Sequence, residues 1–158
     1  MCAFFNEKYG GLCLEEKYME IAIEEATKSF KKGDVPVGAV IVKDGKIISR
    51  AHNKKEKNKM ATSHAEIIAI QKACKKNNNW RLDGCEIYIT LEPCLMCYGA
   101  ILETRMSKIV YGASSEKYGF KNKIKKASII SKDIVIIEGI CKIESQKLLK
   151  SFFVNKRK

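Results

Sequence analysis

Apolar residues recur at regular intervals along most of this chain. Over residues 15–32 they fall at every fourth position, the spacing of one face of an α-helix, and Gly33 follows as a helix end. Similar spacing recurs in later segments. We expect a first helix over 15–32, with an apolar stripe of Leu14, Tyr18, Ala22, Ala26 and Phe30. A second helix should run from a cap at Thr62 or Ser63 to about Lys76, with Ile67, Ile70 and Cys74 inward. Further helices are expected from Pro93 to about Thr104, over 144–155, and more weakly over 122–130.

Short β-branched runs alternate with these helices. Residues 37–42 and 46–51 flank Asp44-Gly45, a dipeptide that favours a two-residue hairpin turn, so these two strands should pair antiparallel. Residues 54–59 form a charged segment that we expect to be a solvated loop. Further strands are expected over 86–91, with Ile87 and Ile89 on one face and Tyr88 on the other, 108–111 and 134–138. Helices alternating with strands predict a three-layer α/β domain, and the hairpin makes its sheet mixed.

The chain has 158 residues, enough for one domain that buries roughly 70% of the surface exposed by its unfolded form. No apolar run approaches the length of about 20 residues that spans a bilayer, so no membrane partner is expected. Residues 1–14 mix acidic and basic side chains and lack the order of a signal peptide. We expect a cytoplasmic protein with an N-terminal extension over 1–14, for which disorder is an open alternative, and one domain over 15–158.

The net charge of +12 changes this picture by suggesting a partner. A positive field of that size attracts polyanions and raises their rate of encounter, which favours a nucleic acid or another acidic partner. A lysine- and asparagine-rich composition can also reflect the genome alone. Charge therefore leaves both explanations open.

Cysteine placement indicates a metal site. Of seven cysteines, only Cys94 and Cys97 form a CxxC pair, and a chain without a secretion signal favours reduced thiols. Cys74 and Cys141 lie in apolar stretches and are expected to pack in the core. Cys94 and Cys97 lie one turn apart at an expected helix start, where the helix dipole favours thiolate.

One imidazole can join these two sulfurs. The chain has only two histidines, and His64 is preferred over His52 because His64 has a carboxylate, Glu66, two residues away. Three protein ligands would leave the fourth tetrahedral position of zinc open, which is typical of a catalytic site. The alternative is that the cysteines are buried apolar thiols and His64 is a helix cap.

His64 and Glu66 can face one point only under a geometric condition. On a continuous helix they would point roughly 200° apart, since each residue turns about 100°. They converge only if His64 lies in or before the first turn. Capping residues at Thr62 and Ser63 permit that arrangement.

The motifs carry a resemblance that covers nearly the whole chain from about Glu15. In order and spacing the chain resembles the bacterial-type tRNA adenosine deaminases, which make inosine at the wobble position and belong to the cytidine deaminase-like zinc superfamily, whose signature is H-x-E followed by P-C-x-x-C. The matching stretches are GDVPVGAVIV at 33–42, TSHAEI at 62–67, TLEPCLMCYGAI at 90–101, VYGA at 110–113, and Phe152-Phe153 with Arg157.

The resemblance implies a cytidine deaminase-like fold with a five-stranded mixed sheet and one zinc per subunit, held by His64, Cys94 and Cys97. Zinc would lower the pKa of a bound water to about 7. Glu66 would carry a proton from that water to the ring nitrogen and then to the leaving amine. The expected reaction is hydrolytic conversion of adenosine to inosine in tRNA.

The resemblance also implies substrate contacts and a partner. Asn53 would bond the flipped-out base, Val35 would line the base pocket, and Phe152, Phe153 and Arg157 would contact the anticodon stem-loop of tRNA, an arginine tRNA by analogy. The family is a homodimer with shared active sites. Asn53 as a turn cap, and the two phenylalanines as core, are the alternatives.

Three departures concern substrate contacts and leave the zinc chemistry untouched. Ser114-Ser115 stands where the family carries an acidic residue, the 122–133 connection is short, and Ser145 replaces a common cysteine. Two other functions stay open. One is a guanine or cytosine deaminase acting on a free base, and the other is a non-catalytic RNA-binding subunit, which the presence of Glu66 disfavours.

Overall fold

A mixed sheet forms the middle layer of the protein in the computed structural model, which describes residues 13–124 and 133–156. Its strands are β1 (Gly38–Lys43), β2 (Lys46–His52), β3 (Cys85–Leu91), β4 (Lys108–Ala113) and β5 (Val135–Glu138). They lie in the order β2-β1-β3-β4-β5. β1 is antiparallel to β2 and β3, whereas β4 is parallel to β3 and β5. The expected mixed, five-stranded sheet is confirmed.

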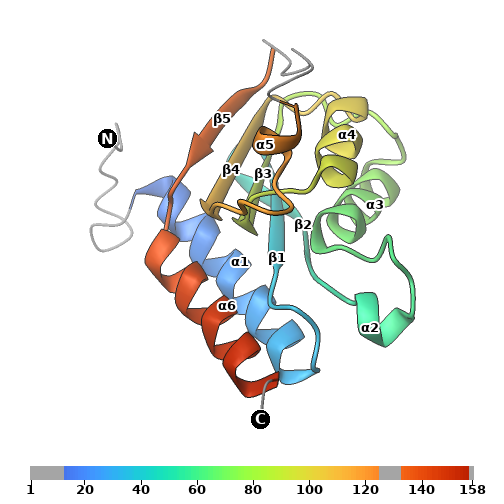
Figure 1. Ribbon diagram of the computed structural model, residues 1–158. Helices are drawn as coiled ribbons and strands as arrows, with labels where there is room; N and C mark the ends of the chain where they lie inside the picture. Colours follow the sequence, from blue (N-terminus) through green and yellow to red (C-terminus); the bar gives the residue numbers. More distant parts are fainter. Residues whose placement is uncertain (1–12, 125–132, 157–158) are drawn as a thin grey trace.

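Helices cover both faces of this sheet (Figure 1). They are α1 (Leu14–Lys31), α2 (Lys55–Asn58), α3 (Ala65–Asn77), α4 (Leu95–Glu103), α5 (Phe120–Ile124) and α6 (Lys142–Lys156). α1 and α6 pack on one face, and α3 and α4 on the other. β3 contributes to both cores, with Ile87 and Ile89 on the α3 side and Tyr88 on the α1 side, as the alternating pattern predicted. Within the described ranges, no helix has the length and apolar character needed to cross a membrane.

The structure differs from the predicted elements at several places. The segment expected to be a solvated loop over 54–59 contains the exposed one-turn helix α2. Only the start of the weak helix expected over 122–130 is seen, as α5, and residues 125–132 lie outside the description, as do residues 1–12 of the expected extension. On α1, Met19, Glu25 and Ser29 are buried while Leu14 is 40% exposed, so the buried face is rotated from the apolar stripe.

The topology places the N-termini of α3 and α4 at the same end of the sheet, beyond the carboxyl ends of β2 and β3. β1 is antiparallel to both β2 and β3, so β2 and β3 run in the same direction. The chain leaves β2 through α2 and then enters α3, and it leaves β3 directly into α4. Polar groups at the N-termini of α3 and α4 can therefore converge beyond the carboxyl ends of these strands, the usual location of sites in open α/β sheets.

α1 and the sheet are in close contact at Gly38. A Cβ atom at Gly38 would collide with the backbone carbonyl of Ala22 and would lie 2.7 Å from the backbone nitrogen of Ala26. Backbone atoms cannot move aside as a flexible side chain can. The absence of a side chain at Gly38 therefore sets how near α1 lies to β1.

We predict that Gly38→Ala lowers the thermal unfolding midpoint by roughly 5–10 °C, because overpacking against backbone costs about 1–3 kcal/mol. The matched control is Gly99→Ala on α4, where a Cβ would meet no atom within 4 Å. That change should leave the midpoint unchanged or raise it, since alanine is the better helix former. Differential scanning calorimetry checks both variants, and a Gly38→Ala midpoint equal to that of the wild type would contradict the packing argument.

Candidate metal centre

His64 and the two cysteines of the CxxC pair meet at the N-termini of α3 and α4. Cys94 Sγ lies 3.6 Å from His64 Nδ1, and Cys97 Sγ lies 3.5 Å from the same nitrogen. The three candidate ligand atoms all lie within 4.8 Å of one another. The structure therefore brings together the three residues that the sequence predicts as ligands.

These distances fit tetrahedral zinc. With Zn–S bonds of about 2.3 Å and a Zn–N bond of about 2.0–2.1 Å, tetrahedral geometry separates sulfur from nitrogen by about 3.6 Å. The two observed separations of 3.6 and 3.5 Å match that value. Over residues 13–124 and 133–156, no further histidine, cysteine or carboxylate joins the cluster. The set can thus hold zinc and leave one coordination position open.

The start of α3 differs from the predicted cap and explains how His64 reaches the cysteines. His64, rather than Thr62 or Ser63, is the N-cap residue, and its backbone is extended (φ −75°, ψ 151°). Ser63 instead accepts a hydrogen bond from the Asn58 side chain at its hydroxyl and one from the Lys54 amide at its carbonyl. His64 therefore precedes the first helical turn, which is the condition for convergence with Glu66.

The start of α4 also lies later than predicted. Cys94 is the N-cap residue, with φ −73° and ψ 170°, and the helix begins at Leu95 rather than at Pro93. The Pro93 carbonyl accepts a hydrogen bond of 3.0 Å from the Phe120 amide, which ties this turn to α5. Cys94 and Cys97 thus flank the first turn, with Cys97 buried and Cys94 partly exposed.

Electrostatics within the cluster favour one thiolate. The pKa of Cys94 falls to about 4 because its sulfur accepts hydrogen bonds from the Cys97 thiol and from His64. The adjacent Cys94 thiolate raises the pKa of Cys97, as does burial. The pKa of His64 rises chiefly through its hydrogen bond to Cys94. A cation at this position would replace the shared protons as the neutralising charge.

Glu66 lies in the first turn of α3 and is 4% exposed. Burial raises the pKa of this carboxyl group, and the neighbouring His64 and the Cys97 thiol oppose the rise. A carboxyl group that is shielded from water and lies next to the ligand cluster can hold and release a proton near the open coordination position. The role expected of Glu66 stays a prediction.

Two buried carboxylates near this edge were not identified from the sequence. Glu92 is 6% exposed and accepts hydrogen bonds from the amides of Ser115 (2.8 Å) and Lys121 (3.1 Å). It thereby holds the segment whose Gly119 forms a β-bridge with Cys94. The expected departure at Ser115 is therefore part of a loop that Glu92 fixes through the backbone. Only the position of Glu92 inside the LEPC motif could have indicated this.

Asp34 is the second of these carboxylates, at 1% exposure. Its two oxygens accept hydrogen bonds from the amides of Glu56 (2.7 Å) and Lys57 (3.2 Å), so it caps α2 from a distance. Its neighbour Val35 is half-buried. Asp34 thus anchors the loop that carries Val35 to the segment that leads into α3.

Asn53 and Val35, the two residues expected at the base, contact each other. The Asn53 side chain donates from Nδ2 to the Val35 carbonyl at 3.3 Å. Its Oδ1 is buried and has no hydrogen-bond partner among the described residues. The next amide, that of Lys54, donates to the Ser63 carbonyl beside His64. Asn53 is therefore joined to the metal cluster by a short run of backbone contacts.

The aromatic pair near the C-terminus divides into two environments. Phe152 is 4% exposed, and its ring packs edge-on against Phe30 at 5.9 Å, so it belongs to the core. Phe153 is 48% exposed and is the member of the pair available to a partner. Arg157 lies outside the described residues.

Comparisons with known proteins agree with the geometry of the site. Residues 14–157 match the MafB19-like deaminase family. The tRNA-specific adenosine deaminase of Bacillus subtilis (strain 168) is 40% identical over 147 residues, which cover 91% of this chain and 91% of that protein. The chain belongs to the tRNA-specific adenosine deaminase family. The tRNA-specific adenosine deaminase of Aquifex aeolicus (strain VF5) is 49% identical over 105 residues, covering 66% of this chain and 70% of that protein.

Solved structures support the family and the fold. A tRNA:A34 deaminase studied for A-to-I editing at the wobble position superposes with a TM-score of 0.78 at 34% identity, covering 84% of this chain and 99% of that one. A guanine deaminase from Bacillus subtilis matches with a TM-score of 0.60 at 36% identity, covering 71% of this chain and 69% of that one. The resemblance inferred from the motifs and the α/β fold are confirmed, and the chain is a deaminase.

We predict that the purified deaminase carries about one zinc per chain, and that Cys97→Ser lowers this content severalfold because it removes one of three ligands. Cys74→Ser is the matched control, since Cys74 is a free cysteine outside the cluster and hydrogen-bonds the Trp80 carbonyl. Inductively coupled plasma mass spectrometry measures the metal. Equal zinc content in the two variants would remove Cys97 from the ligand set.

Proposed function

We propose that this protein is a zinc-dependent hydrolase that converts adenosine to inosine at the wobble position of tRNA. The observation that carries the proposal is the cluster of His64, Cys94 and Cys97, with matching sulfur–nitrogen separations and Glu66 buried beside it. The 40% identity to the Bacillus subtilis tRNA-specific adenosine deaminase, over 91% of both chains, supports the substrate.

The proposed reaction assigns different roles to the ligand residues and to Glu66. His64, Cys94 and Cys97 would hold zinc, which would make a bound water acidic enough to lose a proton near neutral pH. Glu66 would carry that proton to the purine ring nitrogen as the water oxygen bonds to the amine-bearing carbon. It would then carry the second proton of the same oxygen to the amine, so that the carbon–nitrogen bond breaks and ammonia leaves. Its burial keeps the proton from exchanging freely with bulk water.

Base binding is assigned to Asn53 and Val35. The unpaired, buried Oδ1 of Asn53 is an acceptor that a donor group of the base would satisfy, which removes the cost of leaving it without a partner. Val35 offers an apolar side chain next to it. A base must leave the stack to reach such a pocket, and unstacked loop bases are the usual targets of sequence-specific RNA recognition.

The likeness to the family also supports proposals about the tRNA contacts and the oligomeric state. The net charge of +12 favours a polyanion, and Phe153 and Arg157 are the proposed contacts to the anticodon stem-loop of an arginine tRNA. We propose a homodimer whose subunits each hold one zinc. The cytoplasmic location expected from the sequence stays a prediction.

The free-base alternative has less support. The Bacillus subtilis guanine deaminase is 36% identical but superposes with a TM-score of only 0.60, against 0.78 for the tRNA:A34 deaminase. Guanine and cytosine are small and largely uncharged, so an enzyme acting on them gains nothing from a charge of +12. A non-catalytic RNA-binding subunit would have no need for a buried Glu66.

We predict that the zinc-loaded protein converts the wobble adenosine of an arginine tRNA with an ACG anticodon to inosine, detected by sequencing. Glu66→Gln should reduce turnover by about 10²–10⁴-fold and keep its zinc, because it removes proton transfer and no metal ligand. Glu103→Gln is the control, a neutralised carboxylate on the exposed side of α4, and should retain wild-type turnover.

Each outcome is decisive. An absence of inosine from zinc-loaded wild-type protein would reject the proposed function. Ammonia released from guanine or cytosine, without conversion of tRNA, would select the free-base alternative. Unchanged turnover in Glu66→Gln would remove Glu66 from the chemistry.

A further inference from the structure

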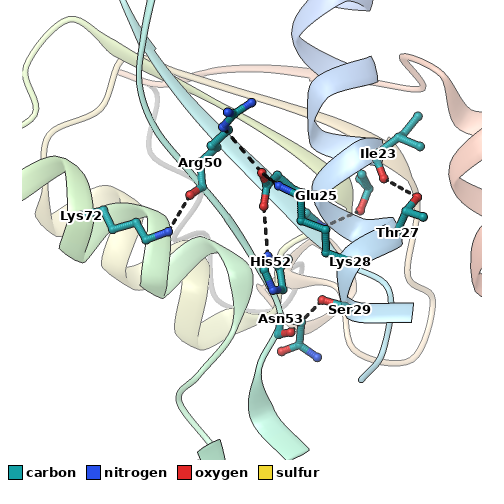
Figure 2. A network of polar contacts seen from close by, with 11 residues as sticks. Ile23, Glu25, Thr27, Lys28, Ser29, Arg50, His52, Asn53 and Lys72 are labelled. Atoms are coloured by element: carbon teal, nitrogen blue, oxygen red, sulfur yellow. Dashed lines mark hydrogen bonds and ion pairs between the residues drawn. The ribbon is translucent and has the colours of Figure 1, made fainter. Parts of the chain in front are cut away.

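Away from the metal centre, a buried carboxylate on α1 contacts the end of β2. Glu25 Oε2 lies 3.0 Å from His52 Nδ1, and the two side chains are 5% and 10% exposed. The other oxygen, Oε1, lies 2.6 Å from Lys28 Nζ and 3.7 Å from Arg50 Nε, near the surface. Figure 2 shows Glu25 between these groups, with His52 directed toward it from the strand. The proposed chemistry uses none of these four side chains.

One turn further along α1, Ser29 makes a second contact to the same region. Its hydroxyl donates a hydrogen bond of 2.7 Å to the backbone carbonyl of Asn53 (Figure 2). Residues four apart on a helix share one face, so Glu25 and Ser29 point the same way. α1 therefore contacts two consecutive residues, His52 through its side chain and Asn53 through its backbone.

The close approach of α1 at Gly38 makes these contacts reachable. Gly38 pairs with His52 in the β1–β2 ladder, and it is the position where a Cβ would collide with α1. The α1 residues at that point, Ala22 and Ala26, are small and fully buried. Because Gly38 has no side chain, α1 can pack closely enough to bring Glu25 and Ser29 to the end of β2.

The protonation states make the Glu25–His52 contact stable around neutral pH. Burial alone would raise the pKa of Glu25, but hydrogen bonds from Lys28 and His52 outweigh it and hold the pKa below its usual value. Burial lowers the pKa of His52, helped by Lys54 and Lys32 and opposed by Glu25. An ionised carboxylate only accepts, so Nδ1 of a neutral His52 carries the proton that it donates to Glu25.

These contacts leave Asn53 little freedom. Its amide donates to the Val37 carbonyl at 3.0 Å, its carbonyl accepts from Ser29, and its Nδ2 donates to the Val35 carbonyl. Oδ1 alone is left unpaired, although it is buried. An acceptor held in this way costs stability in the free protein, which is offset only when a ligand donates to it.

We propose that Glu25 is a positioning residue of the substrate site: through His52, and together with Ser29, it fixes Asn53 so that Oδ1 meets the base. The inference rests on the proposed function, because Asn53 is assigned to the base there. It adds that α1, which packs on the sheet face opposite α3 and α4, influences how well the base is held.

The test compares Glu25→Ala with Glu24→Ala, a neighbouring glutamate on the exposed face of α1. We expect Glu25→Ala to lower kcat/KM for a tRNA anticodon stem-loop by about tenfold with unchanged zinc content, and Glu24→Ala to change it by less than about twofold. Glu25→Gln keeps an acceptor for His52 Nδ1 and should recover most of the loss. Ser29→Ala, a milder change, should lower kcat/KM in the same direction and replaces Glu25→Ala if that variant unfolds.

A double-mutant cycle separates positioning from general stability. In an Asn53→Ala background, Glu25→Ala or Ser29→Ala should change kcat/KM by less than about twofold, because the side chain that they position is gone. An equal loss in both backgrounds would overturn the inference and leave the proposed function intact.

A measurement independent of turnover covers the case in which wild-type protein makes no inosine. With ¹⁵N-labelled asparagine, the Asn53 side-chain amide resonance is identified by its loss in Asn53→Ala. It should shift in Glu25→Ala and Ser29→Ala and stay in place in Glu24→Ala. An unmoved resonance in the two buried-face variants would overturn the positioning role, whatever the substrate.

Discussion

The arrangement depends on one constraint, that one imidazole and two sulfurs from separate helix starts come close enough to hold a single ion. Separations of 3.5 and 3.6 Å from His64 Nδ1 to the two sulfurs leave little tolerance, since a shift of an ångström would break the ligand set. The sheet meets this demand because β2 and β3 run in the same direction, so that α3 and α4 begin at the same edge. Extended backbone at both N-cap residues then turns His64 and Cys94 toward each other.

Four carboxylates among the described residues are buried, and they differ in what they contact. Glu25, Asp34 and Glu92 each accept hydrogen bonds from side chains or backbone amides, and each joins segments that are distant in sequence. Burial of charge is tolerated there because the acceptor positions are filled. Glu66 differs, because it faces the cysteine cluster and burial raises its pKa. Three of the carboxylates therefore join segments of the fold, and the fourth, Glu66, is the one that we propose carries a proton.

The predictions from sequence were right where a residue pattern repeats, and wrong where a single tertiary contact sets a helix start or buries a polar residue. Alternation in 86–91 gave both faces of β3 correctly, and the hairpin turn gave the mixed sheet. Helix starts were wrong by one or two residues at Thr62 and Pro93, because the candidate ligands His64 and Cys94 take the cap positions themselves. The inward face of α1 was predicted only in part. Tyr18, Ala22 and Ala26 of the apolar stripe are buried, but Glu25 and Ser29 were missed, because an apolar stripe cannot reveal buried polar residues whose partners lie on another element.

By itself the sequence determined most of the elements, their approximate bounds, and the three candidate ligands with the nearby acid, because spacing and residue type carry that information locally. The tertiary structure decided which groups meet: the common point of His64, Cys94 and Cys97, the burial of Phe152 against Phe30, and the contacts of Glu25 and Ser29 with the end of β2. These depend on strand direction and on the distance between α1 and β1. Both are set by packing between segments far apart in the chain, which no local pattern specifies.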